Sequence, residues 1–107
     1  MLDTSIIGNV HVFAPTKNLM GAYETEALKA AVADIAAQGI PRVVVDLGKT
    51  AWVSSLGLSG LIRANKTCVA HQGWLRIARP GKRVNPVIFT VRLDCYETIE
   101  GALNAPA

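Results

Sequence analysis

The hydrophobic positions in the first part of the chain predict a hairpin followed by a helix. Two short apolar runs, at 6–7 and 10–13, flank the turn-forming pair Gly8-Asn9, which is typical of a small hairpin or of one bulged strand. From Leu28 to Ala36, apolar residues recur at i, i+3, i+4, i+7 and i+8, which places them on one face of a helix. A glycine and a proline shortly afterwards are expected to end this helix.

An unbroken apolar run and a second helical pattern occupy the middle of the chain. Residues 42–47 form a β-branched run without alternation, which is typical of a strand that is covered on both faces in a parallel sheet. After a turn, the serines at 54–55 open a helix that is expected to end by Gly73. Its helical spacing is carried by Leu58, Leu61, Ile62, Asn65 and Val69.

The rest of the chain continues the alternation of strand and helix. The pattern predicts a strand at 74–78, a short strand near 95–96 and a last helix from 98 through 103. Apolar residues at 84, 87, 88 and 91 mark a third helix, whose start is expected to be delayed to Pro86. Such alternation predicts one α/β domain over residues 1–107, with right-handed crossovers and helices that cover a mixed, mostly parallel sheet.

Composition and length exclude several classes of protein. The chain has 107 residues, of which 50% are hydrophobic and 18% charged, so we expect a packed core rather than a disordered tail. No apolar run approaches the roughly 18 residues that span a bilayer, so no membrane insertion is expected. The first residues include Asp3 and lack the pattern of a secretion signal, which favours the cytoplasm. Cys68 and Cys95 are too few for a disulfide scaffold and are expected to be small core residues.

The charges are distributed unevenly, although the net charge is only +3. Between Asp46 and Asp94 there is no acidic residue, so the second half should carry a positive field that attracts an acidic protein, a nucleotide or a nucleic acid. A solvated basic surface without a ligand explains the same pattern. The basic residues of this interval are Lys49, Arg63, Lys66, Arg76, Arg79, Lys82, Arg83 and Arg92.

Sequence signatures of catalysis and of metal binding are missing. The chain has no glycine-rich phosphate loop, and the segment at 57–60 is too short for a nucleophile elbow. His11 and His71 lie far apart without the spacing of metal ligands. Trp52 and Trp74 are most simply packing residues in the core or at its rim. We therefore expect no enzyme activity, metal or cofactor.

The segment Ser54-Ser55-Leu56-Gly57-Leu58 stands out because two hydroxyls lie where a turn becomes a helix. One serine can accept hydrogen bonds from the first N–H groups of the helix, and as an N-cap it needs no further role. A phosphate here would meet the positive end of the helix dipole and unused backbone donors, so the fold would tolerate phosphorylation. The nearly two added charges would repel a partner without unfolding the domain, which suits a switch.

These residues carry a resemblance to a known family. The run Val43–Leu47, followed by Val53–Leu61, resembles the hallmark of the STAS domain family (sulphate transporter and anti-sigma factor antagonist). That hallmark is an apolar strand followed by Asp/Ser-Ser-x-Gly-Leu at the start of a helix. The resemblance covers about residues 5–104, including the closing Glu-x-x-x-x-Ala-Leu from Glu97 to Leu103.

The resemblance implies a cytoplasmic bacterial regulator of transcription. Stand-alone STAS proteins similar to this one are mostly anti-sigma factor antagonists, which bind an anti-sigma factor, often a serine kinase, and so release a sigma factor. The kinase phosphorylates the serine at the helix start and abolishes binding, and a serine phosphatase restores it. Here that serine aligns with Ser55. Ser54 stands where many members have aspartate, and Leu56 replaces the usual small or hydroxyl residue.

The resemblance and the chemistry together predict a partner-binding surface. It comprises the start of the second helix and the loop after the first strand region, and Gly57 is expected to let the partner approach closely. The proposed members are Thr16, Lys17, Asn18, Ser54, Ser55, Leu56, Gly57, Leu58 and Ser59.

Two alternative functions remain at this point. The first is a STAS subunit that docks on a transporter ATPase, which needs an interface but no reversible phosphate. The second is a small nucleic-acid binder, motivated by the acid-free interval 47–93. Against it, the chain has few aromatic residues and no recognisable stacking motif or recognition helix, so direct nucleic-acid binding is not expected.

Overall fold

The chain begins with a hairpin at the edge of a sheet. The computed structural model describes residues 2–16, 22–82 and 93–106. Strand β1 (Leu2–Ile7) pairs antiparallel with strand β2 (Val10–Pro15), and Gly8 at the turn has a positive φ of 63°. Glycine adopts this conformation without steric cost, which explains the sharp reversal between the two apolar runs. The hairpin that the sequence predicts is confirmed.

The other strands join this hairpin in a single mixed sheet. Strand β3 (Arg42–Asp46), strand β4 (Trp74–Ala78) and strand β5 (Cys95–Tyr96) follow in the order β1-β2-β3-β4-β5. Every pair except β1–β2 is parallel. The predicted α/β fold with a mixed, mostly parallel sheet is therefore confirmed.

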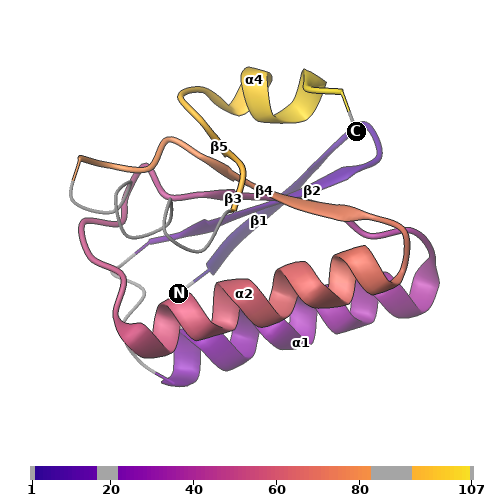
Figure 1. Ribbon diagram of the computed structural model, residues 1–107, viewed down its shortest axis with the longest axis horizontal. Helices are drawn as coiled ribbons and strands as arrows, with labels where there is room; N and C mark the ends of the chain where they lie inside the picture. The colour runs from indigo at the N-terminus through magenta and orange to yellow at the C-terminus, as the bar shows by residue number, and fades with distance from the viewer. Residues whose placement is uncertain (1, 17–21, 83–92, 107) are drawn as a thin grey trace.

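Helices cover the two faces of the sheet unequally. Helix α1 (Ala22–Gln38) and helix α2 (Ser55–Ala70) lie side by side on one face, whereas the short helix α4 (Ile99–Asn104) lies on the other (Figure 1). The predicted helix at 84–91 falls outside the described residues. Within the described ranges, no helix is long and apolar enough to cross a membrane.

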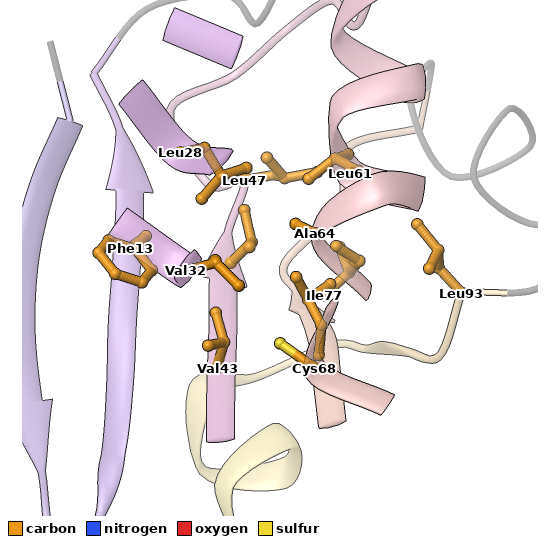
Figure 2. Close-up of a cluster of buried hydrophobic side chains, with 12 residues drawn as sticks. Phe13, Leu28, Val32, Val43, Leu47, Leu61, Ala64, Cys68, Ile77 and Leu93 are labelled. Carbon is orange, nitrogen blue, oxygen red and sulfur yellow. The ribbon is translucent and has the colours of Figure 1, made fainter. Parts of the chain in front are cut away.

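The main core lies between the sheet and the helices α1 and α2 (Figure 2). Val43 and Val45 point into it, whereas Val44 points to the opposite face and joins a smaller cluster under α4. Both faces of β3 are thus covered, which is why its apolar run does not alternate. Labelled members of the main core in Figure 2 are Phe13, Leu28, Val32, Val43, Leu47, Leu61, Ala64, Cys68, Ile77 and Leu93.

Cysteine and arginine side chains take structural roles in these cores. Cys68 is buried, burial raises the pKa of its thiol to about 11, and Cys95 packs against the main core, as expected. Arg76 is buried on the α4 side of the sheet. Its guanidinium donates hydrogen bonds to the carbonyl oxygens of Ala102 (2.9 Å) and Pro106 (3.0 Å) and stacks on Trp74 at 3.8 Å. Arg76 therefore holds the C-terminal segment to the sheet and does not contribute to a basic surface.

The helices α1 and α2 approach each other closely at a glycine. Gly60 is buried on α2, and a Cβ placed there would overlap with the Cγ2 methyl of Thr25 on α1. Thr25 is itself buried. This close contact determines how α2, and with it the segment that begins at Ser55, lies against the rest of the domain.

Candidate functional site

The carboxyl ends of β3 and β4 are joined by a charged pair next to the turn that leads to α2. Arg79 donates hydrogen bonds to Asp46 from Nε to Oδ1 (2.9 Å) and from Nη2 to Oδ2 (2.6 Å). The backbone N–H of Gly48 donates to the same Oδ1 at 2.9 Å, and a side chain at this glycine would collide with the guanidinium. The pair therefore fixes the path of the chain where it leaves β3.

Asp46 is held in its charged form. Burial of the carboxyl group by itself raises its pKa. The hydrogen bonds from Arg79 and Gly48, with the charges of Arg79 and Lys49, outweigh burial, so the pKa of Asp46 lies below its ordinary value. A carboxyl group with a lowered pKa in the folded state stabilises the fold above its unfolded pKa of about 3.9. This stabilisation is lost as the pH falls through the lower, folded value.

Removal of the Arg79 guanidinium should reveal how the stability of the fold depends on the ionisation of Asp46. We expect Arg79→Met to lower the free energy of unfolding at pH 7 by about 1–2 kcal/mol, since the bonds are charge-assisted but Arg79 is partly exposed to water. The difference from the wild type should shrink as the pH falls from about 4 to 2, measured by urea unfolding. Lys82→Met, which removes an exposed cation, should change stability by less than about 0.5 kcal/mol. A difference that is independent of pH would contradict the role of Asp46.

The two serines at the start of α2 have different roles. Ser54 is the N-cap, with an extended backbone, and its Oγ accepts a hydrogen bond from the N–H of Gly57 at 3.1 Å. Ser55 is the first residue of the helix and is exposed. The predicted cap is confirmed, and it is provided by Ser54. The hydroxyl of Ser55 is therefore the one presented on the surface at the positive end of the helix.

Large apolar side chains lie exposed close to Ser55 in the chain. Leu56 is 49% exposed, as the surface hypothesis requires, and Trp52 is 50% exposed. Trp52 is expected from the sequence to pack in the core or at its rim, and its exposure shows that it is not a core residue. Its position two residues before a cap was the only signal in the sequence that it borders the site. Leu58 and Ser59 are half-buried.

The other predicted contact residues are placed less uniformly. Gly57 is buried within the chain, so little of its surface is accessible. The close approach of a partner at this glycine stays a prediction. Thr16 follows β2 and is half-buried, at the edge of the sheet where β3 also ends, because β2 and β3 are parallel. Lys17 and Asn18 lie outside the described residues.

The acid-free interval does not form one continuous basic surface. Arg76 is buried and Arg79 is paired with Asp46, while Lys49 lies 3.9 Å from Asp3. Arg63 and Lys66 remain, both exposed on α2, together with Lys82, which is exposed after β4. Arg83 and Arg92 fall outside the described residues. Two of these three exposed cations therefore lie on one helix.

The described residues offer little to a metal ion. In these ranges, no three histidine, cysteine, aspartate or glutamate side chains come together as a group of ligands. His11 lies on β2 and His71 caps the C-terminus of α2. A cavity of about 690 Å³ lies beside Arg79 and is lined by side chains of both signs, but Ser54 and Ser55 do not contribute to it.

Comparison with known proteins gives one family and several similar folds. The model of the family described as "STAS domain" matches residues 1–104. TM1081 of Thermotoga maritima, provisionally described as an anti-sigma factor antagonist, superimposes with a TM-score of 0.84 at 20% identity, over 95% of this chain and 91% of that one. No curated protein sequence matches significantly.

Two further structures show how the same fold occurs elsewhere. The anti-sigma factor antagonist SpoIIAA in its unphosphorylated form gives a TM-score of 0.79 at 13% identity, over 96% of this chain and 94% of that one. The murine anion transporter Slc26a9 gives 0.74 at 14% identity, over 92% of this chain but 18% of the transporter. At these identities the likeness is one of fold.

Proposed function

Because the chain belongs to the STAS domain family, we propose that it is an anti-sigma factor antagonist, a non-catalytic cytoplasmic protein that binds an anti-sigma factor and so releases a sigma factor. The partner is a serine kinase. It phosphorylates Ser55, which switches binding off, and a serine phosphatase restores the active form. The binding surface is formed by Ser54, Ser55, Leu56, Leu58 and Ser59 at the start of α2, together with Trp52 and the segment 16–18.

The division of roles between the two serines is the observation that carries this proposal. Ser54 uses its hydroxyl as the N-cap, whereas Ser55 is exposed one residue later. A phosphate on Ser55 would lie at the positive end of a 16-residue helix, which favours it by about 0.3–1 kcal/mol. Phosphorylation therefore changes the charge of the surface without opposing the fold.

Mapping of phosphorylation sites tests the proposal. The chain is incubated with ATP and each purified anti-sigma factor kinase of the source organism, and the products are examined by mass spectrometry. Wild type and Ser54→Ala should carry phosphate on residue 55, whereas Ser55→Ala should bind the kinase and stay unmodified. Phosphate on Ser54 or Ser59 alone would overturn the assignment of the residue.

A second candidate function is a STAS subunit that docks on a transporter ATPase without being phosphorylated. The observation that motivates it is that the same fold occurs as part of a transporter chain, the murine anion transporter Slc26a9. It requires that binding be independent of ATP and that no serine become modified. Tight binding to an ATPase by wild type and Ser55→Asp alike would support this candidate against the first.

An acidic side chain in place of Leu56 should weaken the complex. We expect Leu56→Asp to raise the dissociation constant for the anti-sigma factor more than tenfold, or about 1.4 kcal/mol, because an exposed apolar contact is replaced by a charge. The measurement is isothermal titration calorimetry. Ile40→Asp is the matched control, since Ile40 is similarly exposed (46%) but precedes the amino end of β3, whereas α2 follows its carboxyl end. Equal affinities of the two variants, with both folded, would discard this surface.

A further inference from the structure

We propose that the anti-sigma factor binds with an acidic amphipathic helix that lies along the whole exposed face of α2, beyond its first turn. This inference rests on the proposed function and specifies its partner. The contact line, which we call the α2 seam, consists of Ser55, Ser59, Ile62, Lys66 and Val69.

The spacing of the seam is that of a helix-packing surface. Its residues are separated by four, three, four and three positions, which is the 3.5-residue repeat with which one helix packs along another. The buried side of α2 lies opposite, at Gly57, Gly60, Leu61, Ala64 and Cys68. The seam therefore faces away from the core over about 21 Å, at about 1.5 Å per residue.

The side chains of the seam suit a helix as occupant. Ser55 and Ser59 are small and let another backbone approach, while Ile62 is half-buried and Val69 is 59% exposed. The helical pattern of the sequence places Val69 with the core residue Leu61, but in the structure it is one of the most exposed large apolar side chains of the described ranges. An apolar residue at this position is explained if a partner covers it.

The charge of this face determines the sign of the partner. Helix α2 contains no acidic residue, and Lys66 lies in the seam with Arg63 beside it. In the described part of the chain, neither of these cations forms an ion pair, whereas Lys29, Lys49 and Arg79 each lie within 4.0 Å of a carboxylate. Two cations that form no ion pair with the described residues, beside exposed apolar groups, are complementary to a helix that carries carboxylates along an apolar stripe.

A nucleic acid is a weaker candidate for the same face. Binding to phosphates depends on several cations, and α2 has two, with apolar residues on both sides of Lys66. The apolar residues of the seam, Ile62 and Val69, would make no favourable contact with a phosphate backbone. A protein helix uses both the charges and the apolar groups.

Charge reversal within the seam tests the inference. Lys66→Glu is compared with Lys82→Glu, which makes the same change at an exposed position outside α2. In 50 mM salt, Lys66→Glu should weaken binding to the anti-sigma factor at least about tenfold and Lys82→Glu less than about threefold. The difference in affinity between the two variants should become smaller in 500 mM salt, because salt screens the attraction between Lys66 and the carboxylates of the partner. Methyl cross-saturation from the bound factor should reach Ile62 and Val69.

The outcomes separate the inference from the proposed function. If no anti-sigma factor binds the wild-type chain, the proposed function fails and the seam fails with it. If a factor binds but Lys66→Glu and Lys82→Glu behave alike and no saturation reaches Val69, the seam is wrong while the proposed function stands. A DNA duplex of about 20 base pairs is added to the complex as a competitor. If the duplex displaced the factor from the wild-type chain but not from Lys66→Glu, this face would be assigned to a nucleic acid and the inference would be overturned.

Discussion

Replacing Ser55 with aspartate is expected to weaken binding of the anti-sigma factor at least about hundredfold, or about 2.7 kcal/mol, with a nearly unchanged melting temperature. Ser55 is exposed in the first helical turn, where an acidic side chain is favourable to the fold. In the complex, the same charge would face desolvation and, against an acidic partner, like-charge repulsion. Calorimetric titration measures the affinity, and differential scanning calorimetry the melting temperature.

The matched control for this variant is Ser55→Asn. Asparagine has nearly the shape of aspartate without its charge, so it should bind within about tenfold of the wild type, and Ser55→Ala should bind normally. If asparagine weakened binding as much as aspartate, size rather than charge would control the contact. Ser55 would then be an interface residue without the properties of a switch.

Adding one methyl group at Gly60 is expected to destabilise the fold by about 1–3 kcal/mol. In an exposed helix, the change from glycine to alanine stabilises by up to about 1 kcal/mol, so the sign of the effect identifies the cause. Here the added Cβ would overlap with the Cγ2 of Thr25, and both residues are buried where α1 and α2 meet. Denaturation with urea measures the decrease in the free energy of unfolding.

A second substitution should restore this stability. Thr25→Ser removes the methyl group that the new Cβ would meet and keeps the hydroxyl. The double variant Gly60→Ala/Thr25→Ser should therefore be more stable than the sum of the single effects, with a coupling of at least about 0.5 kcal/mol. Additive effects would show that the glycine is needed for the helix backbone and not for the close approach of the helices.

The strands and helices could be predicted because each has a distinct local pattern. The turn at Gly8, the unbroken run of β3 and the cap at Ser54 all involve residues close together in the chain. Local hydrogen bonding and the covering of both sheet faces determine these features. The same holds for Leu56, whose exposure follows from its place beside a cap.

Other properties of the site depend on which distant residues come together. The sequence pattern places Val69 with the apolar residues of α2, but the contact of α2 with α1 rotates the helix so that Gly60, Leu61, Ala64 and Cys68 face inward and Val69 outward. The burial of Gly57 is decided in the same way. A helical repeat in the sequence defines the apolar face of a helix. It does not determine which residues at the margin of that face are covered by neighbouring elements.

The sequence by itself determined the element order, the mixed sheet with its covering helices, and a pair of hydroxyls at a helix start, because all of these follow from periodicity and capping along the chain. The tertiary structure alone decided which charges are available to a partner. Asp46 meets Arg79 across 33 positions, and Arg76 meets the C-terminal carbonyl groups across 26 and 30. Because of these contacts, Arg76 and Arg79 are not available to a partner, although the sequence does not distinguish them from the other cations. Arg63 and Lys66 keep their charge on the surface because α2 presents them outward, where the described chain has no carboxylate within ion-pair distance.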